Sequence, residues 1–241
     1  MKSRLSFCGA SFRGFCAALL AAAVLANVAH GSPPARQLIG RSVDGRPIYV
    51  EQLGSAGGRS VLVVGCIDGN EPAGIAIVRA LERLGAQAGI DFWLIGALNP
   101  DGLAAGTLGN ARGVDLNRNF PYGWRHLGGS GPLDSGPRAL SEPESRAAYQ
   151  LILRARPTLS IWFHQHLAVV DDSQGSQALE RRFAKLVGLP AAPLPDYPGS
   201  AASWENHRFP GTTAFVTELP AGSLTAVQAR RYAQAIIAIA R

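Results

Sequence analysis

The sequence predicts an α/β protein in which buried strands alternate with helices. Residues 60–84 begin with the apolar, β-branched run V-L-V-V, which ends at a glycine, and continue with apolar residues at helical spacing. The run D-F-W-L-I-G-A-L follows that helix as a second buried strand. Strand, helix and strand in this order predict a parallel pair joined by a right-handed crossover. With 241 residues, 47% of them hydrophobic, the chain can form the core of one or two domains.

The first 31 residues are typical of a secretory signal peptide. Lys2, Arg4 and Arg13 precede an apolar run, and the small residues Ala29 and Gly31 offer a cleavage site. A retained membrane anchor is the alternative, but the apolar run is short of the roughly 20 residues that a spanning helix needs. We therefore expect a secreted or periplasmic protein with a single catalytic domain over residues 32–241 and no stable membrane anchor after processing.

Loss of this segment would change the charge and the cysteine content. The formal net charge of +6 would fall to +3, since three basic residues leave and no acidic ones do. No cluster of Lys and Arg remains, which argues against a nucleic-acid partner. Cys66 would be the one remaining cysteine, so no intramolecular disulfide could form. A free cysteine in an apolar strand is more typical of a buried residue than of a nucleophile.

The remaining elements follow from turn signals and periodicity. Asp44 and Gly45 form a hairpin turn signal between two short strands. Ser141, with a glutamate three residues on and a proline in the first turn, reads as a capping box. Further elements are expected at 141–154 (helix), 158–166 (strand), 176–187 (helix), 212–220 (strand) and 224–240 (amphipathic helix).

Two long segments predict loops. Residues 99–102, N-P-D-G, are turn formers, and 102–131 have little periodicity and much Gly, Asn and Arg. Residues 191–211, rich in Pro, Gly and aromatics, predict a second loop. Long loops inside a compact domain are usually functional. The alternative for 102–131 is a surface loop whose polar side chains satisfy its own backbone.

Four groups of polar residues fall at or near predicted strand ends. They are Asp68 with Glu71, Asn117 with Arg118, His164, and Glu218. A set of Asp, Glu and His ligands with one further carboxylate suits a hydrolytic zinc site, because three protein ligands leave a position for water. Arginine can bind a substrate carboxylate through two parallel hydrogen bonds. The alternative is a solvated turn in which Glu71 only complements the dipole of the following helix.

The chain resembles the zinc carboxypeptidase family, in particular the short bacterial branch that includes the murein peptide amidases. The resemblance is carried in order by the motifs G-C-I-D-G-N-E-P-A-G, N-P-D-G, R-G-V-D-L-N-R-N-F-P, S-E-P-E-S-R-A, I-W-F-H-Q and F-V-T-E-L-P. Together they span about residues 65–220. The resemblance implies a mixed sheet of about eight strands with helices on both faces.

The resemblance also implies roles for individual residues. Asp68, Glu71 and His164 would hold one zinc ion, and Glu218 would be the general base. The residues that would contact a peptide with a free C-terminal carboxylate are Asn117, Arg118 and Arg112, of which Arg112 looks more like a loop-structuring residue. His166 is a rival for the place of His164, since strand alternation would put both on one face. The expected protein is a monomer.

Two positions depart from the family pattern. Asp68 stands where the family has a ligand histidine; zinc accepts aspartate, but two anionic ligands would cancel the metal's formal charge and weaken its pull on water. Leu108 stands where relatives have an arginine thought to stabilise the oxyanion, and losing one such donor costs about 2.7 to 4 kcal/mol. The sequence thus leaves open a degenerate member that binds peptides without cleaving them. A deacylase of N-acyl amino acids is a third alternative.

Overall fold

The computed structural model describes Met1 and residues 35–54, 57–128 and 133–241. The predicted signal peptide lies outside the described residues, apart from Met1. All helices and strands belong to a compact unit, Gly31–Arg241. Among the described residues, no helix combines the length and the hydrophobicity that crossing a membrane requires.

A mixed seven-stranded sheet forms the centre of the described structure. The spatial order is β1-β2-β4-β3-β5-β6, with β7 pairing with β5. Both β1 with β2 and β2 with β4 are antiparallel, whereas the other pairs are parallel. The strands are β1 (Ala35–Arg41), β2 (Pro47–Gly54), β3 (Arg59–Val64), β4 (Ile90–Ile95), β5 (Leu159–Asp171), β6 (Ala191–Ala192) and β7 (Thr213–Pro220). The expected mixed sheet is confirmed, with seven strands rather than about eight in the described part of the chain.

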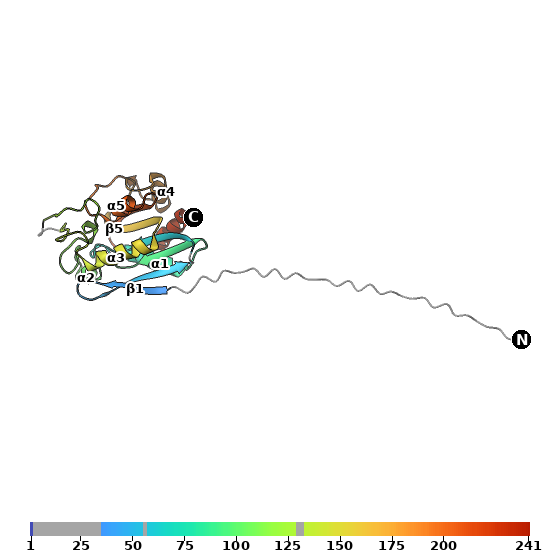
Figure 1. Cartoon of the computed structure of the whole chain (residues 1–241). Coiled ribbons are helices and arrows are strands. Elements are labelled where there is room, and N and C mark those ends of the chain that lie inside the picture. Colours follow the sequence, from blue (N-terminus) through green and yellow to red (C-terminus); the bar gives the residue numbers. More distant parts are fainter. Residues whose placement is uncertain (2–34, 55–56, 129–132) are drawn as a thin grey trace. The chain divides into compact units, whose positions relative to one another are not determined.

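Helices cover both faces of this sheet (Figure 1). The core on one face contains buried residues of α1, α4 and α6, and the core on the other face contains those of α3 and α5. Strand residues alternate between the two cores: Val61 and Val63 belong to the first, Leu62 and Val64 to the second. The helices are α1 (Gly74–Leu84), α2 (Pro100–Ala105), the 3-10 helix η1 (Leu116–Arg118), α3 (Pro143–Ala155), α4 (Gln177–Val187), α5 (Ala201–Arg208) and α6 (Ala226–Ala240).

The hairpin and the parallel pair are confirmed. The chain turns between β1 and β2 at Gly45, whose φ of 81° is in the region that glycine tolerates best. β3 and β4, joined through α1, are parallel. Because β3 and β5 are parallel neighbours, the segments that follow them emerge at the same edge of the sheet.

Three local predictions are wrong. The N-P-D-G segment begins α2, because the Asn99 side chain caps it by accepting a hydrogen bond from the Gly102 N–H at 2.9 Å. The predicted loop 191–211 contains α5, which is short and buried on most sides, so it lacks a clear apolar stripe. α3 begins without a side-chain cap, since the Ser141 hydroxyl donates instead to the Glu142 carboxylate at 2.7 Å.

Candidate metal centre and active site

Asp68 and Glu71 lie on the turn between β3 and α1. The Glu71 N–H donates to the Asp68 carbonyl oxygen at 3.0 Å, and the Gly69 N–H donates to the Leu108 carbonyl oxygen at 3.0 Å. A Cβ atom on Gly69 would come within 2.1 Å of the backbone of Gly102. The turn is therefore packed closely against the α2 region, and only glycine fits at its centre.

His164 reaches the same edge of the sheet from β5. The parallel register ends with Val64 opposite Trp162, so His164 lies two residues beyond the end of β3. The residue is 5% exposed. The sequence alone does not predict that His164 lies near Asp68, because the two residues are 96 positions apart in the chain.

The side chains of Asp68, Glu71 and His164 converge. His164 Nδ1 lies 2.9 Å from Asp68 Oδ2 and 3.3 Å from Glu71 Oε2. One ligand atom from each residue lies within 4.8 Å of the others. Glu71 Oε2 also accepts a hydrogen bond from the Gln165 N–H at 2.8 Å, which fixes its orientation. The three residues predicted as metal ligands thus form one cluster.

The electrostatics of this cluster favour a positive charge at its centre. Burial lowers the pKa of His164, but the charges and hydrogen bonds of Asp68 and Glu71 outweigh burial and raise that pKa to about 10. Nearby, burial and the charge of Asp68 raise the pKa of Asp115 to about 7, against the opposing effect of Arg118. The carboxylates around His164 therefore attract positive charge to this cluster.

The donor set fits a zinc ion. One imidazole nitrogen and two carboxylate oxygens are ligand types that zinc accepts. Asp68 Oδ1 is buried and has no hydrogen-bond partner among the described residues. A buried carboxylate oxygen without a partner is costly, and a bound cation would satisfy it.

Asn117 and Arg118 are held beside this cluster by η1. The Asp115 side chain caps η1 by accepting from the Asn117 N–H at 2.9 Å. Asn117 Nδ2 lies 3.2 Å from His164 Nε2, while Asn117 Oδ1 accepts from the Ala201 N–H at 3.0 Å. Asn117 is therefore in direct contact with the candidate ligand His164.

Arg118 lies 9% exposed at the edge of the cluster. Its Nη1 donates to the Asn117 carbonyl oxygen at 2.9 Å, and its guanidinium carbon lies 4.2 Å from the centre of the Tyr197 ring. Backbone and aromatic contacts fix the direction of the guanidinium.

Glu218 lies on β7, opposite His164 in the register with β5. One carboxylate oxygen accepts a weak hydrogen bond from the Leu167 N–H at 3.4 Å. Burial raises the pKa of Glu218, assisted by the charges of Glu71 and Asp68 and opposed by that of His164. Glu218 is thus a carboxylate of increased basicity next to the cluster without belonging to it.

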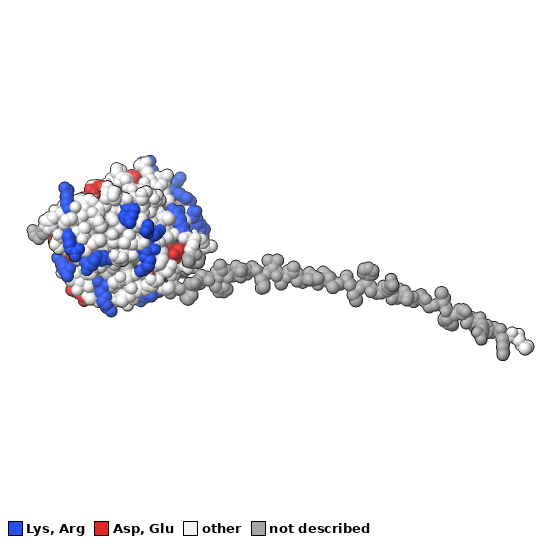
Figure 2. All heavy atoms as spheres, in the orientation of Figure 1, with Lys and Arg blue, Asp and Glu red and all other residues white. Residues whose placement is uncertain are grey.

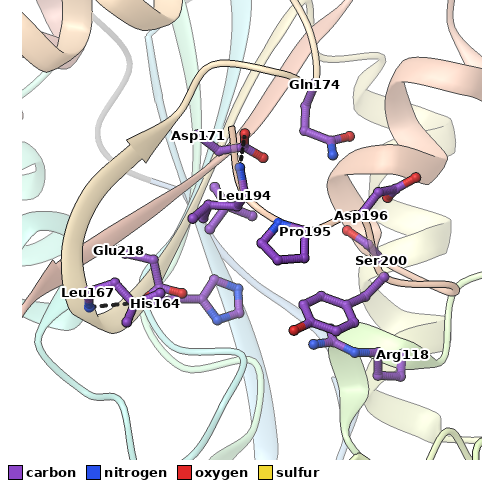
Figure 3. Close-up of a pocket in the computed structure, with 12 residues that line it drawn as sticks. Arg118, His164, Leu167, Asp171, Gln174, Leu194, Pro195, Asp196, Ser200 and Glu218 are labelled. Atoms are coloured by element: carbon purple, nitrogen blue, oxygen red, sulfur yellow. Dashed lines mark hydrogen bonds between the residues drawn. The ribbon is translucent and has the colours of Figure 1, made fainter. Parts of the chain in front are cut away.

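A pocket of about 240 Å³ opens between these groups (Figure 3). Arg118, His164 and Glu218 contribute to its wall. The sequence interpretation missed the other polar wall residues, which come from the end of β5, the segment between β5 and α4, and the segment before α5: Asp171, Gln174, Asp196, Tyr197 and Ser200. For Asp196, Tyr197 and Ser200 the sequence signal was the long Pro-rich segment 191–211, which predicted a loop but named no residue. No signal in the sequence interpretation pointed to Asp171 or Gln174.

Other candidate residues lie apart from the cluster. Arg112 forms an ion pair with Glu142 at 3.3 Å and lines a different hollow, so the structure does not bring it to Arg118. His166 is exposed, because the β5–β7 register shifts after it and the expected alternation stops.

Cys66 is fully buried, as predicted. Burial raises the pKa of its thiol to about 12, assisted by the charges of Asp68 and Glu71. A thiol with so high a pKa is not a nucleophile at neutral pH.

An α/β sheet with a buried cluster of Asp, Glu and His at one edge is typical of metal-dependent hydrolases. The chain matches the zinc carboxypeptidase family over residues 23–174. It is 32% identical over 186 residues to murein peptide amidase A of Escherichia coli (strain K12), which covers 71% of this chain and 76% of that protein. It is 34% identical over 185 residues to murein peptide amidase A of Vibrio campbellii, and this match covers 70% of this chain and 73% of that protein.

A solved structure gives the same result. The crystal structure of the murein-tripeptide amidase from Escherichia coli O157 superposes with a TM-score of 0.70 at 27% identity, over 87% of this chain and 92% of that one. The chain therefore belongs to the zinc carboxypeptidase family.

Proposed function

We propose that the chain is an exported zinc-dependent hydrolase that removes a C-terminal residue from a peptide. The observation that carries this proposal is the convergence of Asp68, Glu71 and His164 beside a pocket lined by Glu218 and Arg118. Two of the relatives are murein peptide amidases, which supports a peptide from the cell wall as the substrate.

The metal would be held by one oxygen each from Asp68 and Glu71 and by Nδ1 of His164, the ring nitrogen that faces both carboxylates. A bound zinc ion supplies Lewis acidity and lowers the pKa of a coordinated water.

Glu218 would act as the general base. Its carboxylate accepts the proton of the attacking water and returns it to the leaving amine when the peptide bond breaks. Its raised pKa improves it as a proton acceptor. Glu218 lies beyond the residues matched by the family, so its role rests on the geometry of β5 and β7.

Arg118 would read the free carboxylate of the terminal residue. Its position in the pocket wall and its fixed guanidinium suit a bidentate contact. The partner is then a peptide with a free C terminus rather than nucleic acid. On the face seen in Figure 2, Lys and Arg side chains lie in several separate places.

Export, domain organisation and assembly complete the proposal. The leader 1–31 would direct the chain to the periplasm or the medium, and residues 32–241 would act as one monomeric catalytic domain. The leader's composition supports export, and the compact unit Gly31–Arg241 supports a single domain.

Selective hydrolysis tests the proposal. The zinc-loaded protein should hydrolyse a peptide with a free C terminus and should lose most activity on the C-terminally amidated peptide, because Arg118 then has no carboxylate to bind. Equal activity on both would contradict the role of Arg118. Cleavage of an N-acyl amino acid alone would favour a deacylase.

A peptide-binding module without efficient catalysis is the second candidate. Two departures from the family pattern favour it. Asp68 in place of histidine would weaken the pull of the metal on its water, and Leu108 in place of arginine removes a hydrogen-bond donor for the oxyanion. The Leu108 carbonyl oxygen contacts the Asp68 turn, but its side chain has no N–H to offer an oxyanion.

The double variant Asp68→His, Leu108→Arg separates the two candidates. If the site is a weakened hydrolase, restoring both groups should raise kcat about 10- to 1000-fold, the usual effect of one oxyanion donor being roughly 10²-fold or more. Each single variant serves as a control for additivity. No gain in any of the three, with zinc bound and peptide affinity retained, would favour the binding module.

A further inference from the structure

We propose that the outer surface of α1, α4 and α6 binds reversibly to a membrane surface of anionic phospholipid. We call this surface the basic face, and its exposed cations are Arg79, Arg83, Arg182, Lys185, Arg230 and Arg231. Two exposed apolar residues, Leu186 and Val227, lie among them. The inference goes beyond the proposed function, because none of these residues lines the pocket beside His164.

The three helices lie side by side on one face of the sheet and share one core. α6 packs between α1 and α4. Arg83 of α1 and Arg230 of α6 line the same hollow. On the other side of α6, Arg231 Nε donates a hydrogen bond to the Leu186 carbonyl oxygen of α4 at 3.0 Å. The exposed residues of the three helices therefore form one continuous surface.

The spacing along each helix places these residues on its outer side. Arg79 and Arg83 are four residues apart in α1, and Val227 and Arg231 are four residues apart in α6. Residues at this spacing are neighbours on a helix surface. Because the six cations come from helices that are far apart in the sequence, the basic face does not appear as a run of Lys and Arg in the chain.

The positive charge on the basic face far exceeds the negative charge. Among the residues that the structure describes, none of the six cations forms an ion pair, whereas Arg181 of α4 pairs with Asp172 at 2.7 Å. Glu180 of α4 is fully buried, and Glu82 of α1 is the one exposed carboxylate on the three helices. Burial and then the charge of Glu51 on β2 raise the pKa of Glu82. A single carboxylate leaves most of the six positive charges uncompensated.

The two apolar residues determine which kind of anionic partner fits. Leu186 is 39% exposed and lies four residues after Arg182 in α4. Val227 is 80% exposed and lies three residues before Arg230 and four before Arg231 in α6. A soluble polyanion offers charge but no contact for exposed aliphatic groups. A bilayer surface offers phosphates to the cations and hydrocarbon just below them to the apolar side chains.

The hollow between α1 and α6 suits a phosphate head group. Its volume is about 310 Å³, and Arg83 and Arg230 line it together with three apolar residues and no acidic one. Two guanidinium groups can bind phosphate oxygens through parallel hydrogen bonds. Each basic residue close to an anionic membrane strengthens binding about five-fold, so six of them suffice for reversible attachment.

A second copy of the chain is a poorer occupant of this surface. A two-fold symmetric dimer formed through the basic face would place the same patch of each copy against the other. The cations of the two copies would then repel each other. An anionic bilayer has the opposite charge and extends over the whole width of the three helices.

Vesicle sedimentation tests the proposal. The protein is mixed with vesicles of equal parts phosphatidylglycerol and phosphatidylcholine, or of phosphatidylcholine alone. The full chain and the compact unit from Gly31 are both measured, because the leader is itself apolar and basic. We expect both forms to prefer the anionic vesicles, and the binding to weaken as salt is added. No such preference in the compact unit would overturn the proposal.

Paired charge variants assign the binding to the basic face. Arg83→Gln with Arg230→Gln should lower the partition coefficient on anionic vesicles about 30-fold, at about five-fold per residue. Arg182→Gln with Lys185→Gln gives an independent second pair on α4, should the first pair not fold.

The matched control is Arg154→Gln with Arg208→Gln. It removes two exposed cations from α3 and α5, which cover the opposite face of the sheet. The control should bind the vesicles as the wild type does. Equal losses in the control and in the basic-face variants would show that net charge alone matters and would contradict the assignment.

The Val227→Thr variant separates a membrane from a soluble polyanion. Threonine keeps the branched shape but replaces a methyl group with a hydroxyl. We expect binding to the anionic vesicles to weaken about 3- to 10-fold, since one membrane-buried methylene contributes about four-fold. Binding to dextran sulfate should not change. An unchanged affinity for the vesicles, or binding of dextran sulfate without any binding of vesicles, would favour a soluble polyanion and overturn the proposal.

Discussion

The candidate site concentrates charge on a few buried atoms. His164 contacts two carboxylates through Nδ1 and an amide through Nε2, so its ring position is fixed from both sides. Glu218 lies opposite it on β7 but forms no bond to the ring. This separation of a candidate ligand set from a free base is what a metal-assisted hydrolysis requires.

The Glu218→Gln variant tests the role of the base. We expect kcat to fall about 10²- to 10⁴-fold, the usual contribution of general acid–base catalysis, because glutamine cannot accept the proton. Zinc content and KM should stay close to those of the wild type, since Glu218 is not part of the metal cluster. Activity within a few-fold of the wild type at full zinc occupancy would show that another group takes the proton.

At the scale of elements, the turn between β3 and α1 determines the site. Gly69 packs against the backbone of α2, and β3 lies directly beside β5. These two contacts bring Asp68 and His164 together although they are far apart in sequence. A small disturbance of the turn should therefore affect the metal before it affects the rest of the fold.

The Gly69→Ala variant tests this dependence. Its Cβ would meet the Gly102 backbone at 2.1 Å, so the turn must shift, at a cost of about 1 to 3 kcal/mol. We expect a lower Tm and a weaker zinc affinity, measured by calorimetry and by competition with a chelator. The control is Gly96→Ala, where a Cβ meets nothing within 4 Å. Wild-type Tm and zinc affinity in Gly69→Ala would contradict the account.

The sequence predicted the helices and strands themselves better than which of them lie side by side. Periodicity identified β3, α1, β4 and β5, because each has a clear apolar pattern, and motif resemblance supplied Asp68, Glu71 and His164. Strand adjacency does not follow from local pattern, so the residues alone could not place His164 beside Asp68. Asp171 was missed because the predicted strand 158–166 ended before it, whereas β5 continues to Asp171. Asp196 was missed because the segment 191–211 has no periodicity, and α5 was missed because its buried faces leave no apolar stripe.

For the whole molecule, one buried carboxyl joins a helix to the sheet. Glu205 of α5 is fully buried and accepts hydrogen bonds from the Ser160 hydroxyl at 2.6 Å and the Trp162 indole N–H at 2.7 Å. Burial raises its pKa to about 7, although both hydrogen bonds act in the opposite direction. The folded state therefore binds this proton more tightly than the unfolded chain does.

The raised pKa of Glu205 predicts how its contribution to the free energy of unfolding changes with pH. Because the folded pKa of Glu205 exceeds the unfolded value of 4.5, its contribution to the free energy of unfolding should fall as pH rises from about 4.5 to 7. The total change is about 3 kcal/mol at roughly 1.4 kcal/mol per pH unit. Urea unfolding of the wild type and Glu205→Gln at pH 5 and pH 8 measures it. The variant should gain stability relative to the wild type at pH 8; a pH-independent difference would contradict the raised pKa.

The central claim is that Asp68, Glu71 and His164 hold one zinc ion. X-ray absorption spectroscopy of the zinc-loaded protein tests it most directly. The account predicts about one zinc per chain with a single imidazole and otherwise oxygen ligands at about 2.0 to 2.2 Å, and loss of that zinc in both Glu71→Ala and His164→Ala. Two or more imidazole ligands, a sulfur ligand, or full zinc occupancy in either variant would contradict it.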